Sequence, residues 1–176
     1  MINRIWYSGP PLRVLHNNYA KQGRIDEQAP LQTSSTMALA APVEVVWAQL
    51  IDLAAWPTID PAFHHVQLTG PVAVDRKFSF VLNHFPIKAT FAIVAPNQEL
   101  SWTGVSLWFK AVDRHQLTAT PDGGTHYTLT ESLAGPFATL FMSASQLQQQ
   151  HERWLAAFQQ ALMQRYVTET EQEKVQ

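Results

Sequence analysis

The sequence has no cysteine among its 176 residues. This absence excludes disulfide bonds, thiol catalysis and metal sites built from thiolates. Charged residues are scarce too, at 15% of the chain, against roughly 25% in a typical soluble domain. With a formal net charge of −2 and no run of Lys or Arg, the chain lacks the basic surface of a nucleic-acid-binding protein.

Long apolar runs are also missing. No stretch approaches the roughly 20 residues needed to cross a bilayer, and the opening MINRIWYSGPPLRVLHNNY lacks the apolar stretch of a secretory signal. We therefore expect a cytoplasmic protein with no integral membrane segment. The sequence contains no glycine-rich phosphate loop and no nucleophile elbow, and it predicts neither a cofactor nor a metal site.

Aromatic residues, in contrast, are abundant, with six Trp and nine Phe. Apolar residues make up 46% of the chain, and 176 residues suit one domain. So much aromatic area fits either a large filled core or an apolar cavity.

Three regions differ in composition. Residues 1–30 have little periodicity, and we predict an arm there with a short helix near 12–19. Residues 31–167 form the folded domain, and the charged tail 168–176 is expected to fray. The arm is either flexible or packed on the domain through Ile5, Trp6 and Tyr7.

The pattern within the domain predicts an α+β fold. A strand over 31–39 precedes a helix that begins after Pro42, and a second helical piece follows near Trp56. Six further strands then alternate apolar and polar residues and form an antiparallel meander. The chain closes with an amphipathic helix of about 24 residues, which begins near Leu140.

Two hairpins have predicted registers. A four-residue loop at 83–86 places Phe80 opposite Ala89 and Phe78 opposite Phe91. In the second hairpin, DRHQLTATPDGGTHYTLTES, a turn at residues 122–124 places His115 directly opposite Glu131 on the apolar face.

The closing helix is the natural cover for the apolar face of a curved sheet of about seven strands. Large side chains on both layers are expected to hold them apart and leave a cavity, although a filled core is the alternative. These side chains are Phe78, Phe80, Phe91, Trp102 and Tyr127 on the sheet and Trp154 and Phe158 on the helix.

Three stretches carry a family resemblance: APVEVVWAQLIDLAAWPTIDP (41–61), HQLTATPDGGTHYTLTESLAGP (115–136) and ERWLAAFQQAL (152–162). Over about 31–165 the chain resembles the START/Bet v 1-like (SRPBCC) superfamily and, within it, the polyketide cyclase/dehydrase-like branch. The resemblance implies a helix-grip fold, in which a long cavity lies between the sheet and the C-terminal helix. It does not imply one activity, because the superfamily includes lipid carriers, hormone and quinone binders and cyclases.

His115 and Glu131 are the candidate catalytic residues. An imidazole and a carboxylate within hydrogen-bond reach can hold a proton near neutral pH, as cyclisation and dehydration of polyketones require. The alternatives are polar recognition of a ligand and a structural pair that fixes strand register. His151 lies on the apolar stripe of the closing helix and is expected to point toward the same place.

The leading hypothesis is that the cavity binds a hydrophobic small molecule, such as a lipid, a polyketide or a quinone-like compound. The alternatives are a cyclase or dehydratase that uses the same cavity, and an interaction protein whose arm docks a partner. The sequence predicts no nucleic-acid partner and leaves the oligomeric state open. The residues expected to bind the ligand are Trp56, Phe78, Phe80, Phe91, Trp102, Tyr127, His151, Trp154 and Phe158.

Overall fold

The computed structural model describes the backbone of residues 4–173 and the side chains of residues 5–165. The strands are β1 (Leu31–Leu39), β2 (Phe63–Leu68), β3 (Lys77–Leu82), β4 (Phe85–Ala95), β5 (Glu99–Ser106), β6 (Phe109–Ala119) and β7 (Thr125–Ala134). The main helices are α2 (Val43–Ile51), α3 (Trp56–Ile59), α4 (Ala138–Phe141) and α5 (Ala144–Glu173). Short helical turns complete the chain: η1 (Arg4–Trp6), α1 (Leu12–Val14), η2 (Leu15–Tyr19), η3 (Ala20–Gln22) and η4 (Leu53–Ala55).

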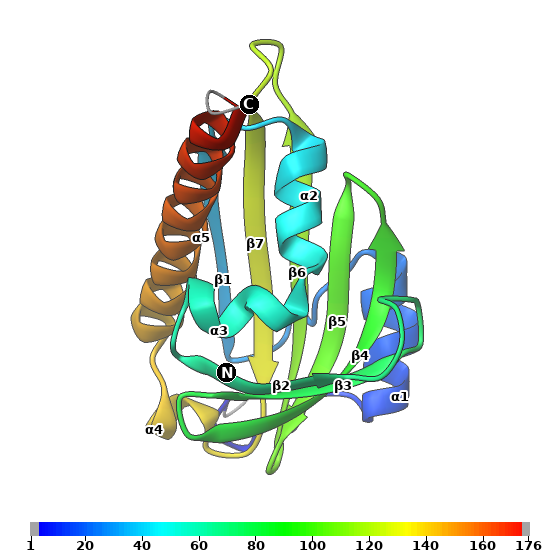
Figure 1. Ribbon diagram of the computed structural model, residues 1–176. Helices are drawn as coiled ribbons and strands as arrows, with labels where there is room; N and C mark the ends of the chain where they lie inside the picture. Colours follow the sequence, from blue (N-terminus) through cyan, green and yellow to red (C-terminus); the bar gives the residue numbers. More distant parts are fainter. Residues whose placement is uncertain (1–3, 174–176) are drawn as a thin grey trace.

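The seven strands form one antiparallel sheet in the order β1-β7-β6-β5-β4-β3-β2. Figure 1 shows α5 lying along the β1–β7 side of this sheet, while α2 and α3 pack on the same face. The predicted α+β architecture, with its seven strands, short helices and long C-terminal helix, is confirmed. Within the described part of the chain, no helix is both long enough and apolar enough to span a membrane.

The register predicted for the β3–β4 hairpin was wrong by two residues. Phe78 pairs with Ala89, and Phe80 pairs with Ile87. The turn is shorter than expected, because Asn83 adopts the left-handed conformation (φ 56°) and β4 already begins at Phe85. A shift of two residues keeps every side chain on its face, so Phe78 and Phe80 are buried as expected.

The β6–β7 hairpin shows the same kind of error. Its loop closes where the Thr120 N–H donates to the Gly124 carbonyl at 2.9 Å, so the hairpin is centred one residue earlier than predicted. His115 therefore pairs with Leu129, and the residue opposite Glu131 is Asp113. The predicted His115–Glu131 pair was wrong, although both residues lie on the inward face.

Helix α5 packs on the sheet through one stripe, in which Leu147, Trp154 and Phe158 are buried. It has 30 residues and continues to Glu173, so it is longer than expected and includes most of the predicted tail; residues 174–176 lie outside the described residues. Trp56 joins α3 to the other layers: its indole N–H donates to the Leu50 carbonyl at 3.1 Å. Its ring also lies 5.6 Å from the rings of both Trp102 and Trp154.

The N-terminal arm packs on the opposite face of the sheet from α5, as the placement of α1 in Figure 1 shows. Leu15 and Ala20 are buried there against Ala92 and Val112. Ile5 and Trp6 are exposed, yet the expected contacts of this segment are present: the Trp6 ring lies 4.5 Å from that of Phe137, and the Ile5 and Tyr7 carbonyls accept from the Phe137 and Gly135 N–H groups.

A buried histidine adds polar contacts between the arm and the sheet. His16 Nδ1 lies 2.9 Å from the Thr103 hydroxyl of β5, and its Nε2 lies 2.9 Å from Asp75. Lys21 also contacts Asp75, at 2.7 Å. The arm therefore fills the outer face of the sheet and makes specific contacts with it.

The contacts of Leu15 predict that the arm contributes to stability. Leu15→Ala should lower the free energy of unfolding by about 2–3 kcal/mol, because it leaves a cavity at a site that cannot fully collapse. Leu12→Ala, in the same arm but exposed, should change it by less than about 0.5 kcal/mol. Urea denaturation measures both, and equal values for the two variants would contradict the packing of the arm.

Candidate functional site

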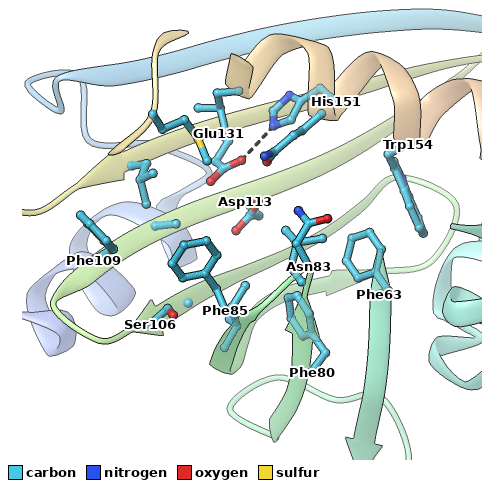
Figure 2. Close-up of a pocket in the computed structure, with 18 of the residues that line it drawn as sticks. Phe63, Phe80, Asn83, Phe85, Ser106, Phe109, Asp113, Glu131, His151 and Trp154 are labelled. Atoms are coloured by element: carbon cyan, nitrogen blue, oxygen red, sulfur yellow. Dashed lines mark hydrogen bonds and ion pairs between the residues drawn. The ribbon is translucent and has the colours of Figure 1, made fainter. Parts of the chain in front are cut away.

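A cavity of about 180 Å³ lies between the sheet and α5. Figure 2 shows aromatic side chains along its walls, with a few polar groups between them. The wall is mostly carbon, and β2 to β7, α3, α4 and α5 all contribute to it. Its apolar lining includes Trp56, Phe63, Phe80, Phe85, Trp102, Phe109, Leu129 and Trp154.

Two carboxyl groups face each other inside this cavity. Asp113 of β6 and Glu131 of β7 are directly paired across the two strands, so their side chains project side by side. Glu131 Oε2 accepts a hydrogen bond from His151 Nε2 of α5 at 2.9 Å, the dashed line in Figure 2. The acid pair and the imidazole therefore form one polar cluster in an otherwise apolar chamber.

Burial raises the pKa of Asp113 well above its usual value, and the negative charge of Glu131 raises it further. The Trp102 indole opposes this increase, but its N–H is buried without a hydrogen bond of normal length to any described residue. Burial and the neighbouring carboxyl group thus favour the neutral, proton-carrying form of Asp113, as expected when two carboxyl groups share an apolar site.

His115 belongs to a separate hydrogen-bond chain. The Trp154 indole N–H donates to the Tyr127 hydroxyl at 3.0 Å, and that hydroxyl lies 2.5 Å from His115 Nδ1. Burial, followed by the positive charge of His151, lowers the pKa of His115 well below its usual value. The ring is therefore neutral, and its Nδ1 shares a buried hydrogen bond with the Tyr127 hydroxyl.

The cavity opens between side chains that are only partly covered. Phe85 is 43% exposed and Phe141 is 61% exposed, and both line the cavity. On another side, an ion pair between Arg153 and Asp60 at 3.2 Å closes the wall between α5 and α3. Within the described residues, no group of three His, Asp or Glu side chains is placed to hold a metal ion.

Comparison with solved structures identifies the fold. The aromatase/cyclase Zhui from a Streptomyces species superposes with a TM-score of 0.66 at 13% identity, over 77% of this chain and 94% of that chain. A START superfamily protein from Mycobacterium smegmatis gives 0.65 at 13% identity, over 76% and 97%. The protein Ara h 8.0201 gives 0.59 at 11% identity, over 76% and 97%.

The chain has the helix-grip fold. No protein-family model matches its sequence, and no curated protein matches it. At these low identities the structural likeness establishes the fold alone and leaves the activity open.

The helix-grip cavity includes some of the predicted ligand-binding residues and not others. Trp56, Phe80, Trp102, His151 and Trp154 line it, as do both candidate catalytic residues, His115 and Glu131. The remaining four are buried in the core behind the cavity wall: Phe78, Phe91, Tyr127 and Phe158.

Asp113 was missed by the sequence reasoning. It lies on the same alternation as His115 and Leu117, two residues apart at each step, so the period of the strand already placed it on the inward face. The wrong register hid its significance, because it assigned the position opposite Glu131 to His115.

The buried acid predicts an unusual dependence of stability on pH. Above about pH 4 the unfolded chain ionises Asp113 while the folded protein keeps it protonated, so folding takes up a proton and stability falls as pH rises. Asp113→Asn removes this titration and should raise the free energy of unfolding at about pH 7 by roughly 1–3 kcal/mol. The gain should disappear near about pH 4.

Asp75→Asn is the matched control. Hydrogen bonds from Lys21 and His16 lower the pKa of Asp75, so this substitution should destabilise the protein at neutral pH and have the opposite sign. Denaturation curves at several pH values measure both variants. An Asp113→Asn protein less stable than wild type at neutral pH would contradict the neutral, buried acid.

Proposed function

We propose that this protein binds a hydrophobic small molecule in the cavity between the sheet and α5. The observation that carries the proposal is the cavity of about 180 Å³ with its aromatic and aliphatic lining. One water needs only about 10–15 Å³ of such space. An apolar chamber of this size leaves its lining atoms without contacts unless a ligand fills it.

The polar cluster defines the ligand further. The Asp113 carboxyl in its neutral form and the Trp102 N–H beside it are both donors, and the remaining Glu131 oxygen is an acceptor. They suit one carbonyl or hydroxyl group on an otherwise apolar body. A lipid, a polyketide or a quinone-like molecule has this chemistry, and the same fold occurs in the aromatase/cyclase named above.

Filling the cavity from its wall tests this function. Ala111 of β6 lines the chamber, and Ala111→Leu adds side-chain volume where the ligand would lie. The probe is N-phenylnaphthylamine, an uncharged aromatic fluorophore. We expect Ala111→Leu to bind it at least about tenfold more weakly than wild type, because the added side chain prevents part of the dye from being buried, and each CH₂ group that is no longer buried costs about 0.8 kcal/mol of binding free energy. Fluorescence titration in buffer gives both affinities.

The control is the same substitution on the same strand outside the chamber. Ala119 is exposed at the far end of β6 and does not line the cavity, so Ala119→Leu should leave the affinity unchanged. Equal affinity in wild type, Ala111→Leu and Ala119→Leu would place the dye elsewhere and refute ligand binding in this cavity.

The second candidate is an enzyme of the cyclase or dehydratase type. It is favoured by one observation: a proton-carrying acid, Asp113, faces a second carboxyl group bonded to an imidazole, Glu131 with His151. Glu131 would remove a proton from the carbon beside a carbonyl, and Asp113 would deliver one to the oxygen. His115 is held by Tyr127 and would stabilise the site rather than transfer the proton.

Substitution of the base separates the two candidates. Glu131→Gln should slow conversion of a poly-β-ketone mimic by about 100-fold or more while its affinity changes by less than about threefold. Single-turnover kinetics and equilibrium binding of the same compound measure the two effects. A parallel loss of affinity and rate would assign Glu131 to binding alone.

A further inference from the structure

Exposed apolar side chains gather around the mouth of the cavity. They come from three connections that are separate in sequence: the β3–β4 turn, the β5–β6 turn and α4. We call them the apolar rim: Phe85 (43% exposed), Leu107 (62%), Trp108 (47%), Leu140 (69%) and Phe141 (61%).

The apolar rim occupies one end of the molecule. β4 begins and β5 ends at this end, since Lys88 pairs with Val105, and β7 leads into α4 there, as Figure 1 shows. The rings of Trp108 and Phe141 lie 6.2 Å apart, which joins two of the three connections. Phe85 and Phe141 also line the cavity, so the rim surrounds its opening.

The same end has no acidic residue in its connecting segments. The chain has 14 Asp and Glu in all, yet residues 83–88, 104–110 and 135–151 contain none. Lys88 and His84 are exposed in these segments, whereas the Lys110 ammonium donates to the Pro10 carbonyl at 2.6 Å. The three rim connections therefore contain basic side chains and no acidic ones, although the exposed Glu27, just before β1, lies at the same end, since Leu31 pairs with Leu133.

We propose that the apolar rim docks this protein on the surface of an anionic phospholipid bilayer. Aromatic and aliphatic tips that project from separate turns suit insertion among headgroups and the upper acyl chains. The exposed Lys88 ammonium is attracted to anionic lipid, and the rim segments contain no carboxylate that the lipid would repel. Docking would place the mouth against the bilayer, and an apolar ligand would pass without crossing water; this last point rests on the proposed function.

Co-sedimentation with vesicles tests the docking. Wild type should bind phosphatidylcholine vesicles that contain about 30% phosphatidylglycerol, and bind pure phosphatidylcholine more weakly. Leu107→Ser/Trp108→Ser should weaken binding to the anionic vesicles about tenfold or more, because both side chains lose their apolar contact with lipid. Leu140→Ser, on another part of the rim, provides an independent variant if the double substitution impairs folding.

Two equally exposed apolar residues lie away from the rim and provide controls: Val74 (48%) and Met163 (62%). Val74→Ser and Met163→Ser should bind vesicles as wild type does. The proposal is overturned if wild type fails to sediment, or if the controls weaken as much as the rim variants. It is also overturned if gel filtration shows a dimer that the rim variants abolish, since the rim would then contact a second copy.

Separate measurements of dye binding and of vesicle binding distinguish a failure of the proposed ligand-binding cavity from a failure of the proposed membrane docking. Leu107, Trp108 and Leu140 do not line the cavity, so the rim variants should bind N-phenylnaphthylamine in vesicle-free buffer as wild type does. Loss of vesicle binding with intact dye binding supports the docking surface. Loss of both in the rim variants overturns their assignment to docking alone.

Discussion

The hydrogen-bond chain from Trp154 through Tyr127 to His115 connects α5 to the centre of the sheet. The Tyr127 hydroxyl accepts from Trp154 at 3.0 Å and lies 2.5 Å from His115 Nδ1, so it links a side chain of the helix to one of the sheet. The rings of Trp154 and Tyr127 thus lie between the backbone of α5 and that of β7. The layers cannot close further without breaking buried hydrogen bonds, and this spacing maintains the cavity beside the chain.

The pair of carboxyl groups in the same cavity, Asp113 and Glu131, lowers the stability of the fold. Burial and the opposing carboxyl group of Glu131 disfavour the charged form of Asp113. An asparagine would fold as well or better at this position, which suggests that the acid serves a ligand rather than the fold. The neutral acid and the His151-bound Glu131 then provide a donor and an acceptor on adjacent strands.

The sequence predicted the faces of the strands well and their pairing less well. Alternation placed Phe78, His115 and Glu131 on the inward side, because side-chain direction depends only on the period of the strand. Pairing depends on the number of residues in each turn, and one left-handed residue such as Asn83 changes that number. The pairing of Asp113 with Glu131 follows from this register, so it could be seen only in the structure and not predicted from the sequence.

The sequence left open whether the N-terminal arm packs on the domain, for a different reason. Its contacts are isolated residues, such as Leu15 and His16, that meet outward-facing positions of β4 to β6. They have no periodicity of their own, since the arm turns through short helical pieces and two prolines. Its partners, such as Thr103, appear in the sequence as ordinary polar positions of a strand.

The most direct test of the account is native mass spectrometry of the freshly purified protein, with extraction and identification of any bound molecule. The account predicts a discrete apolar adduct that carries a carbonyl or hydroxyl group and is absent from Ala111→Leu protein. A wild-type mass equal to that of the bare chain, with no apolar compound in the extract and no uptake of added lipid, would contradict a ligand-binding cavity.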